Sequence, residues 1–131
     1  MKNLLLICLF LSDILIPQIS HSSTSITSSG DIKKEIRLDG SLSENSTRSL
    51  LPAPIEAIIS DSNLEVVFLS NLGNIDVEVS STSGSLVYQN NVNTQTQQNL
   101  SIIVSNWDSG TYQIRFTNSE GRYMYGSFEI E

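Results

Sequence analysis

The sequence predicts an all-β domain, a single sandwich of about seven antiparallel strands. Apolar and polar residues alternate in short segments, which is the period of a half-buried strand. Turn-forming residues separate these segments, and no stretch repeats its apolar residues at the spacing of a helix. Short strands at regular spacing without helices are typical of two packed antiparallel sheets.

The N-terminal residues have the layout of a secretory signal peptide. A short basic start is followed by the apolar run 4–16 and then by Pro17. Small residues two apart, Ser20 and Ser22, predict cleavage after Ser22 or after Ser20. The run is too short for a permanent membrane span, so residues 1–22 predict export to the periplasm, the cell surface or the medium.

Cleavage after Ser22 removes Cys8 and His21, the sole cysteine and the sole histidine of the chain. Cys8 lies inside the apolar run, where a lipoprotein cysteine would not stand. The processed chain would lack thiol and imidazole ligands for a metal and a base for a nucleophilic serine. We therefore expect no cofactor and no enzymatic activity.

The charge of the chain excludes one class of partner. Fourteen acidic residues face seven basic ones, for a net charge of −7. Nucleic-acid binding needs Lys and Arg side chains that replace the counterions of the phosphates. We expect no nucleic-acid partner and no attraction to anionic lipid.

A polar leader is predicted for residues 23–50. Its first part is rich in Ser and Thr and has little to bury, which favours flexibility. Residues 32–38 alternate loosely, with Ile36 and Leu38 on one side, so they form either one edge strand or disordered chain. Two prolines, Pro52 and Pro54, then stiffen the entry to the sandwich domain, residues 51–131.

Seven strands are predicted within this domain. They are centred on segments 55–59, 64–68, 75–79, 86–88, 100–104, 112–116 and 123–130. The amide-rich stretch 89–99 is either a long polar connection or a weak strand pair.

A tyrosine corner is predicted before the sixth strand. Tyr112 follows Gly110 closely, and in such sandwiches a tyrosine there donates a hydrogen bond to the backbone of the corner. Trp107 is expected to cover the core beneath this corner, because large aromatic side chains mainly supply buried area.

Several short marks follow one another in a fixed order along the last part of the chain. They are Arg48-Ser49-Leu50, Leu72-Gly73, Gly84 with Val87-Tyr88, Gly110-Thr111-Tyr112 and Gly126-Ser127-Phe128-Glu129-Ile130. In this order they resemble a family of short secreted proteins from Bacteroides-type gut bacteria, known as a domain of unknown function. The resemblance covers about the last two-thirds of the chain and implies an immunoglobulin/fibronectin-III-like sandwich without catalytic residues to carry over.

The last hairpin predicts an exposed patch. The loop 118–122 suits a three-residue turn with Gly121 in the left-handed region. In the resulting register Met124, Phe128 and Ile130 face the core, whereas Tyr123 and Tyr125 face outward. A bulge near Gly126 would instead turn both tyrosines inward.

Tyr123 and Tyr125, with Arg115 and Gln113 on the neighbouring strand, form a candidate patch for a protein or a glycan. The preferred hypothesis is a non-catalytic module that binds an envelope or extracellular protein. One alternative is a carbohydrate-binding module that uses the tyrosines. The other is a structural subunit that assembles by strand addition through residues 32–38.

Overall fold

The computed structural model describes residues 30–44 and 52–131. The predicted signal segment 1–22, its cleavage site at Ser20 or Ser22 and part of the predicted leader lie outside the described residues. None of the described residues forms a helix, so none forms one that is long and apolar enough to cross a membrane.

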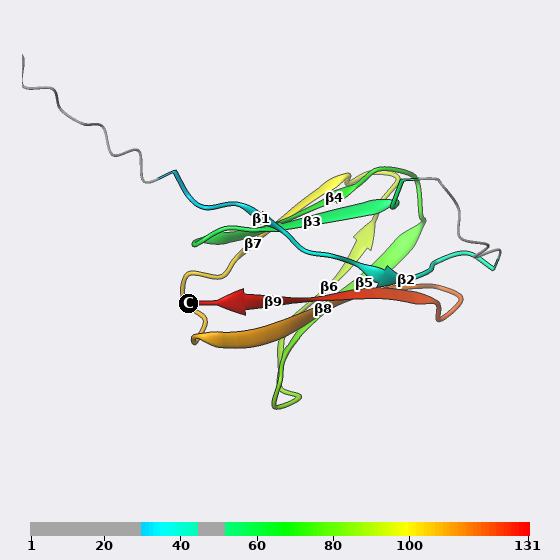
Figure 1. The fold of residues 1–131 in the computed structure, drawn as a ribbon. Coiled ribbons are helices and arrows are strands. Elements are labelled where there is room, and N and C mark those ends of the chain that lie inside the picture. Colours follow the sequence, from blue (N-terminus) through cyan, green and yellow to red (C-terminus); the bar gives the residue numbers. More distant parts are fainter. Residues whose placement is uncertain (1–29, 45–51) are drawn as a thin grey trace, which may run out of the picture.

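Two antiparallel sheets pack face to face, and the all-β sandwich predicted from the sequence is confirmed (Figure 1). The four-stranded sheet has the order β1 (Lys34–Glu35), β3 (Ile55–Ile59), β4 (Asn63–Phe68), β7 (Asn99–Ile103). The five-stranded sheet has the order β2 (Asp39–Gly40), β9 (Tyr123–Ile130), β8 (Gly110–Asn118), β5 (Asn74–Ser81), β6 (Leu86–Asn93).

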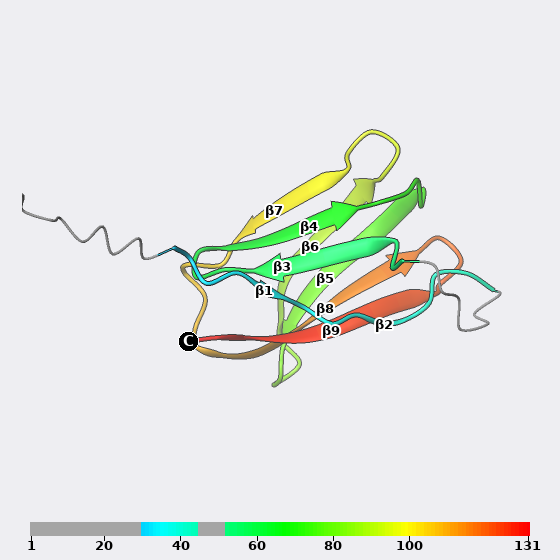
Figure 2. The same cartoon turned by 45° about the horizontal axis from the view of Figure 1, so that its top comes forward.

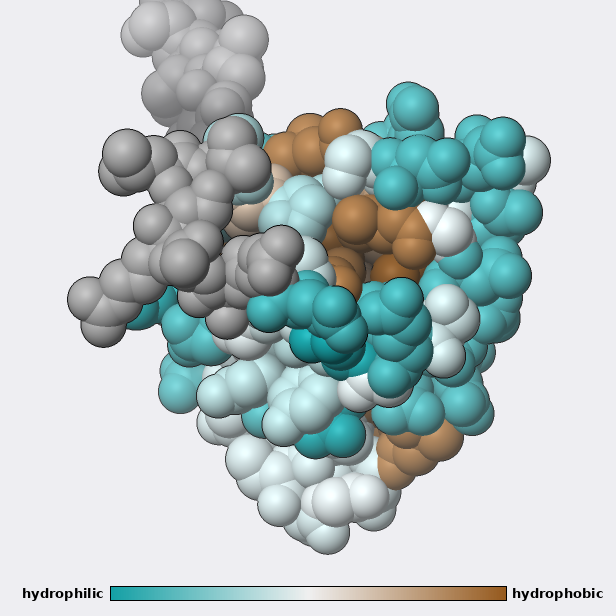
Figure 3. All heavy atoms as spheres, turned by 90° about the vertical axis from the view of Figure 1, so that its right-hand side faces the viewer, coloured by the Kyte–Doolittle hydropathy of each residue, from teal (hydrophilic) through white to brown (hydrophobic). Residues whose placement is uncertain are grey.

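The core lies between the sheets and consists of every second residue of the long strands. Burial alternates along β3 and β9 and along β5 as far as Ser80, as the period of a strand with one core face requires. Phe68 from one sheet meets Phe116 from the other edge to face, with ring centroids 6.3 Å apart. At the end of the sandwich that carries the β8–β9 turn, teal hydrophilic residues lie beside paler residues of intermediate hydropathy, and brown apolar residues show in a few areas between them (Figure 3).

The structure of the amide-rich stretch 89–99 differs from both predictions made from the sequence. β6 continues through it to Asn93, a turn follows, and β7 begins at Asn99. β6 is the last strand of its sheet and buries only Val92 fully, so its hydrophobic pattern is weak. Its side-chain amides compensate, because Gln89 and Asn91 donate hydrogen bonds to Glu78 and Asp76 on β5.

The segment 32–42 contributes to both sheets rather than to one edge. β1 pairs with β3, then the chain crosses to the other sheet, where β2 pairs with β9 (Figure 2). Between them Ile36 is buried in the core, with 4% of its surface exposed, and Leu38 packs against the core.

Gly126 makes this crossing possible. A methyl group built on Gly126 would lie 2.6 Å from the backbone oxygen of Arg37 and 2.7 Å from the side chain of Ile36. No side chain fits at such a close approach, so a glycine is required in the middle of β9 where the segment passes over it.

Candidate functional site

The β8–β9 hairpin places the predicted patch on the outer face of the five-stranded sheet. The backbone N–H of Asn118 donates to the backbone oxygen of Arg122 at 2.9 Å, and Gly121 has a φ of 81°. This closes a three-residue loop and sets Phe116 opposite Met124 and Tyr125 opposite Arg115. The register continues without a shift through Gly126, so the tyrosines keep their outward direction.

The core-facing residues of this hairpin follow the predicted register with one difference. Met124 and Phe128 are buried, whereas Ile130 is half-buried and packs against the edge of the core. Ile130 is the last residue of β9, and one flank of it opens into a cleft between the sheets.

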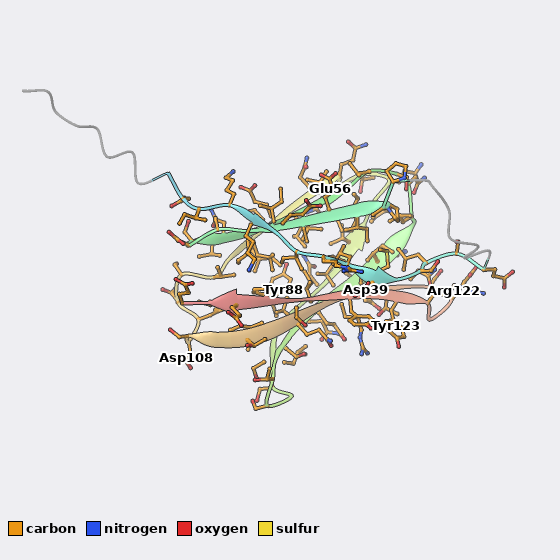
Figure 4. All side chains as sticks on the ribbon, in the orientation of Figure 1. Asp39, Glu56, Tyr88, Asp108, Arg122 and Tyr123 are labelled. Atoms are coloured by element: carbon orange, nitrogen blue, oxygen red, sulfur yellow. The ribbon has the colours of Figure 1, made fainter. Side chains whose placement is uncertain are left out.

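Tyr123, Tyr125 and Arg115, named here the Tyr–Arg cluster, lie in contact on that outer face. Tyr123 and Tyr125 expose 44% and 37% of their surfaces. Their ring centroids are 6.0 Å apart at an interplanar angle of 44°. Figure 4 shows Tyr123 on the side of β8 and β9 that is turned away from the other sheet.

Arg115 stacks on the diagonal neighbour rather than on the tyrosine directly opposite. Its guanidinium carbon lies 4.7 Å from the ring centroid of Tyr123, although the backbone partner of Arg115 is Tyr125. Diagonal neighbours on a sheet face are within reach of long side chains. A cation over an exposed aromatic face contributes about 0.5–1 kcal/mol, which favours a fixed guanidinium.

Polar side chains extend the same face across β8, β5 and β6. Gln113 is half-buried on β8, with Ser127 and Ser80 as its backbone partners. Beyond it Glu78 and Asp76 on β5 accept hydrogen bonds from the β6 amides. The face therefore has an aromatic and cationic part on β9 and β8 and a polar part on β5 and β6.

Nothing in the described ranges gathers His, Cys, Asp or Glu side chains into a group of three that could hold a metal ion. Two carboxylates on this face, Asp76 and Glu78 on β5, already accept amide hydrogen bonds, and a third, Asp39 on β2, lies opposite Tyr125 and pairs with Arg37. The chemistry that the Tyr–Arg cluster offers is hydrogen bonding, stacking and the exposed cation of Arg115.

The residues of the predicted corner form an aromatic stack at the start of β8. The Tyr112 hydroxyl donates to the backbone oxygen of Asp108 at 2.6 Å. The Tyr112 ring centroid lies 5.3 Å from that of Trp107 and 5.8 Å from that of Phe128. Gly110, with a φ of 150°, begins the strand just before them. The corner thus holds β8 and the end of β9 together.

A cleft between the sheets lies where β9 ends, and sequence reasoning did not identify it. It has two neighbouring parts of about 380 and 210 Å³, both lined by Lys34, Ile59 and Glu129. The cleft exists because residues 34–36 bond to β3 of the other sheet instead of lying along the edge of β9. The only sequence signal for this change is a glycine at position 126 within a strand pattern, which usually marks a close backbone approach.

Comparison with known proteins supplies a family and a fold. Residues 35–130 match the family described as "Domain of unknown function (DUF3244)". A crystal structure of a DUF3244 family protein from Bacteroides vulgatus, described as an immunoglobulin-like β-sandwich, superposes with a TM-score of 0.65. The two sequences are 20% identical, and the match covers 76% of this chain and 99% of the other. No curated protein matches the chain.

Proposed function

We propose that this chain, which belongs to the DUF3244 family, is an exported, non-catalytic binding module that recognises an envelope or extracellular protein. The observation that carries the proposal is the Tyr–Arg cluster on the outer face of the five-stranded sheet. The immunoglobulin-like sandwich supplies a rigid support for that face.

The composition of the cluster supports recognition of a protein. Tyrosine and arginine are enriched among the few residues that dominate the energy of protein interfaces. Both tyrosine rings and the guanidinium already contact each other, so little side-chain freedom remains to be lost on binding. Such a cluster is suited to form the centre of an interface.

The shape of the face also favours a protein over a small ligand. Sites for small molecules are concave, and the cleft lined by Lys34, Ile59 and Glu129 lies between β1 and β9, away from the Tyr–Arg cluster. Arg115 also occupies one side of the Tyr123 ring. A glycan stays the second candidate, because the Tyr125 ring and the polar side chains of β5 and β6 lie on the same face.

Export is supported by the first 22 residues of the sequence, which have the order of basic start, apolar run and small cleavage residues. The proposal of a non-catalytic role is supported by the chemistry of the face, where Asp76 and Glu78 are held by amide donors.

Affinity capture with matched variants tests the function. The purified chain, immobilised, is exposed to an envelope extract and, separately, to a glycan panel. We expect a protein to be retained by the wild type and by Ile103→Ala, an exposed apolar residue on the outer face of the other sheet. Tyr123→Ala, Tyr125→Ala and Arg115→Ala should each reduce retention about tenfold or more, as truncation of interface anchors does.

Equal retention by the cluster variants and the wild type would remove the cluster from the interface. Binding to a glycan that the same variants abolish would replace the protein partner by the glycan. Circular dichroism of each variant checks that the loss does not come from unfolding.

A further inference from the structure

Only part of one edge of β9 is paired with another strand. On the side away from β8, β2 pairs with Met124 and Tyr125 and ends there. Residues 126–130 have no strand partner on this side within the described part of the chain. An edge of this kind presents unpaired backbone N–H and C=O groups, which form a template for another strand.

The described part of the N-terminal segment does not pair with the second half of β9. If it had continued along β9, residues 34–37 would stand opposite the second half of the strand. Instead Lys34 and Glu35 pair with β3, and the Ile36 amide donates to the Ala57 oxygen at 2.8 Å. The vacancy therefore has the length of about four strand residues, or about 13 Å.

The cleft opens directly beside the vacant edge. Its larger part, about 380 Å³, is lined by Ile59 from one sheet and Ile130 from the other. Its smaller part, about 210 Å³, reaches Ile36 and Phe128. Side chains of an added strand that point toward the core would thus meet apolar walls.

The charges around the cleft define the chemistry of an occupant. Asp61, Glu129 and Glu131 line the larger part, with Lys34 as the one base among its lining residues. Glu129 is exposed and faces outward on β9, between the inward residues Phe128 and Ile130. A basic side chain on the outer face of an added strand would lie opposite Glu129, where opposite charges stabilise a cross-strand pair.

We infer that the vacant edge of β9 accepts an extended segment of a partner protein by strand addition, antiparallel to β9 and in line with β2. Residues directly opposite each other share a face of the sheet. The segment therefore carries an apolar residue opposite Phe128, a Lys or Arg opposite Glu129 and an apolar residue opposite Ile130. This site is separate from the Tyr–Arg cluster and does not depend on the function proposed for it.

A labelled peptide tests the inference on the full chain. The probe is a capped heptapeptide of the sequence Ser-Val-Thr-Val-Lys-Val-Thr, and fluorescence anisotropy measures its binding. We expect saturable binding that falls about tenfold when the peptide lysine is replaced by glutamate. The variant Glu129→Lys should reverse this preference, whereas Glu56→Lys, exposed on the outer face of the other sheet, should leave it unchanged.

Amide hydrogen exchange gives the second readout. On peptide binding, amides within 127–130 should gain protection, because alternate backbone groups of the β9 edge become paired. Absence of peptide binding, binding that Glu129→Lys leaves unaltered, or protection that appears elsewhere would each overturn the inference. Self-association of the chain that Glu129→Lys abolishes would assign the edge to a second copy instead, and would overturn the partner proposed here.

Discussion

The two halves of β9 are secured in different ways. In the first half, Tyr123 to Gly126, β8 pairs with one edge, and β2 pairs with Met124 and Tyr125 on the other. The second half, Ser127 to Ile130, pairs with β8 alone and is held from beneath by the stack of Phe128 on Tyr112. One strand thus combines a closed edge, stabilised by the crossing segment, with an open edge stabilised by the tyrosine corner.

The N-terminal segment therefore stabilises the fold where it crosses between the sheets and leaves the edge of β9 unpaired beyond that crossing. Ile36 enters the core at the crossing, so the segment cannot be regarded as a separate leader in this part of the chain. The same crossing leaves the edge beyond Gly126 uncovered. Three substitutions separate these contributions.

The largest effect is expected for Ile36→Ala. Ile36 is 4% exposed, and its removal leaves a cavity where the segment crosses between the sheets. We expect a loss of about 3 kcal/mol in the free energy of unfolding, measured by urea denaturation. Ile32→Ala is the matched control, since Ile32 is 79% exposed and should change stability little. An equal loss for both variants would contradict the core role of Ile36.

Gly126→Ala should have the next largest effect. The new methyl group would meet the Arg37 backbone oxygen at 2.6 Å, so the crossing segment must move away. Overpacking of this kind costs about 2 kcal/mol. Amide exchange of Met124 and Tyr125, the partners of β2, should speed up, whereas Ser127→Ala should leave these rates unchanged. Unaltered exchange in Gly126→Ala would show that the segment adapts without leaving β9.

The smallest effect is expected for Tyr112→Phe. The variant keeps the aromatic stack but loses the hydroxyl that donates to Asp108. A hydrogen bond of this type contributes about 1 kcal/mol, so the unfolding midpoint should fall modestly. The open half of β9 should exchange its amides faster than the closed half. Tyr88→Phe serves as control, because the Tyr88 hydroxyl bonds only to the exposed Asn90 among the described residues.

The sandwich could be predicted because its strands follow local patterns. The pairing of Phe116 with Met124 was predictable from the loop alone, since a three-residue turn with Gly121 fixes the register of the strands it joins. The exposure of Tyr123 and Tyr125 follows from that register and the period of two. The far end of β6 was not predictable in the same way, because an edge strand of amides buries almost nothing.

The diagonal contact of Arg115 with Tyr123 also lay beyond sequence reasoning. The register brings Tyr125 opposite Arg115, but a long flexible side chain can select either neighbour on the face. The choice depends on the positions of the rings rather than on the pairing of the backbones.

The all-β class, the position of most strands in the domain and the turn of the last hairpin could be predicted from the sequence alone, whereas the outward direction of Tyr123 and Tyr125 needed the unshifted register of the structure. These features depend on the alternation of apolar residues and on turn residues, which act over a few neighbours. Only the tertiary structure decided which sheet the N-terminal segment joins, and therefore where the edge of β9 is open. That decision depends on Ile36 and Gly126, residues 90 positions apart in the chain, whose close contact no local pattern encodes.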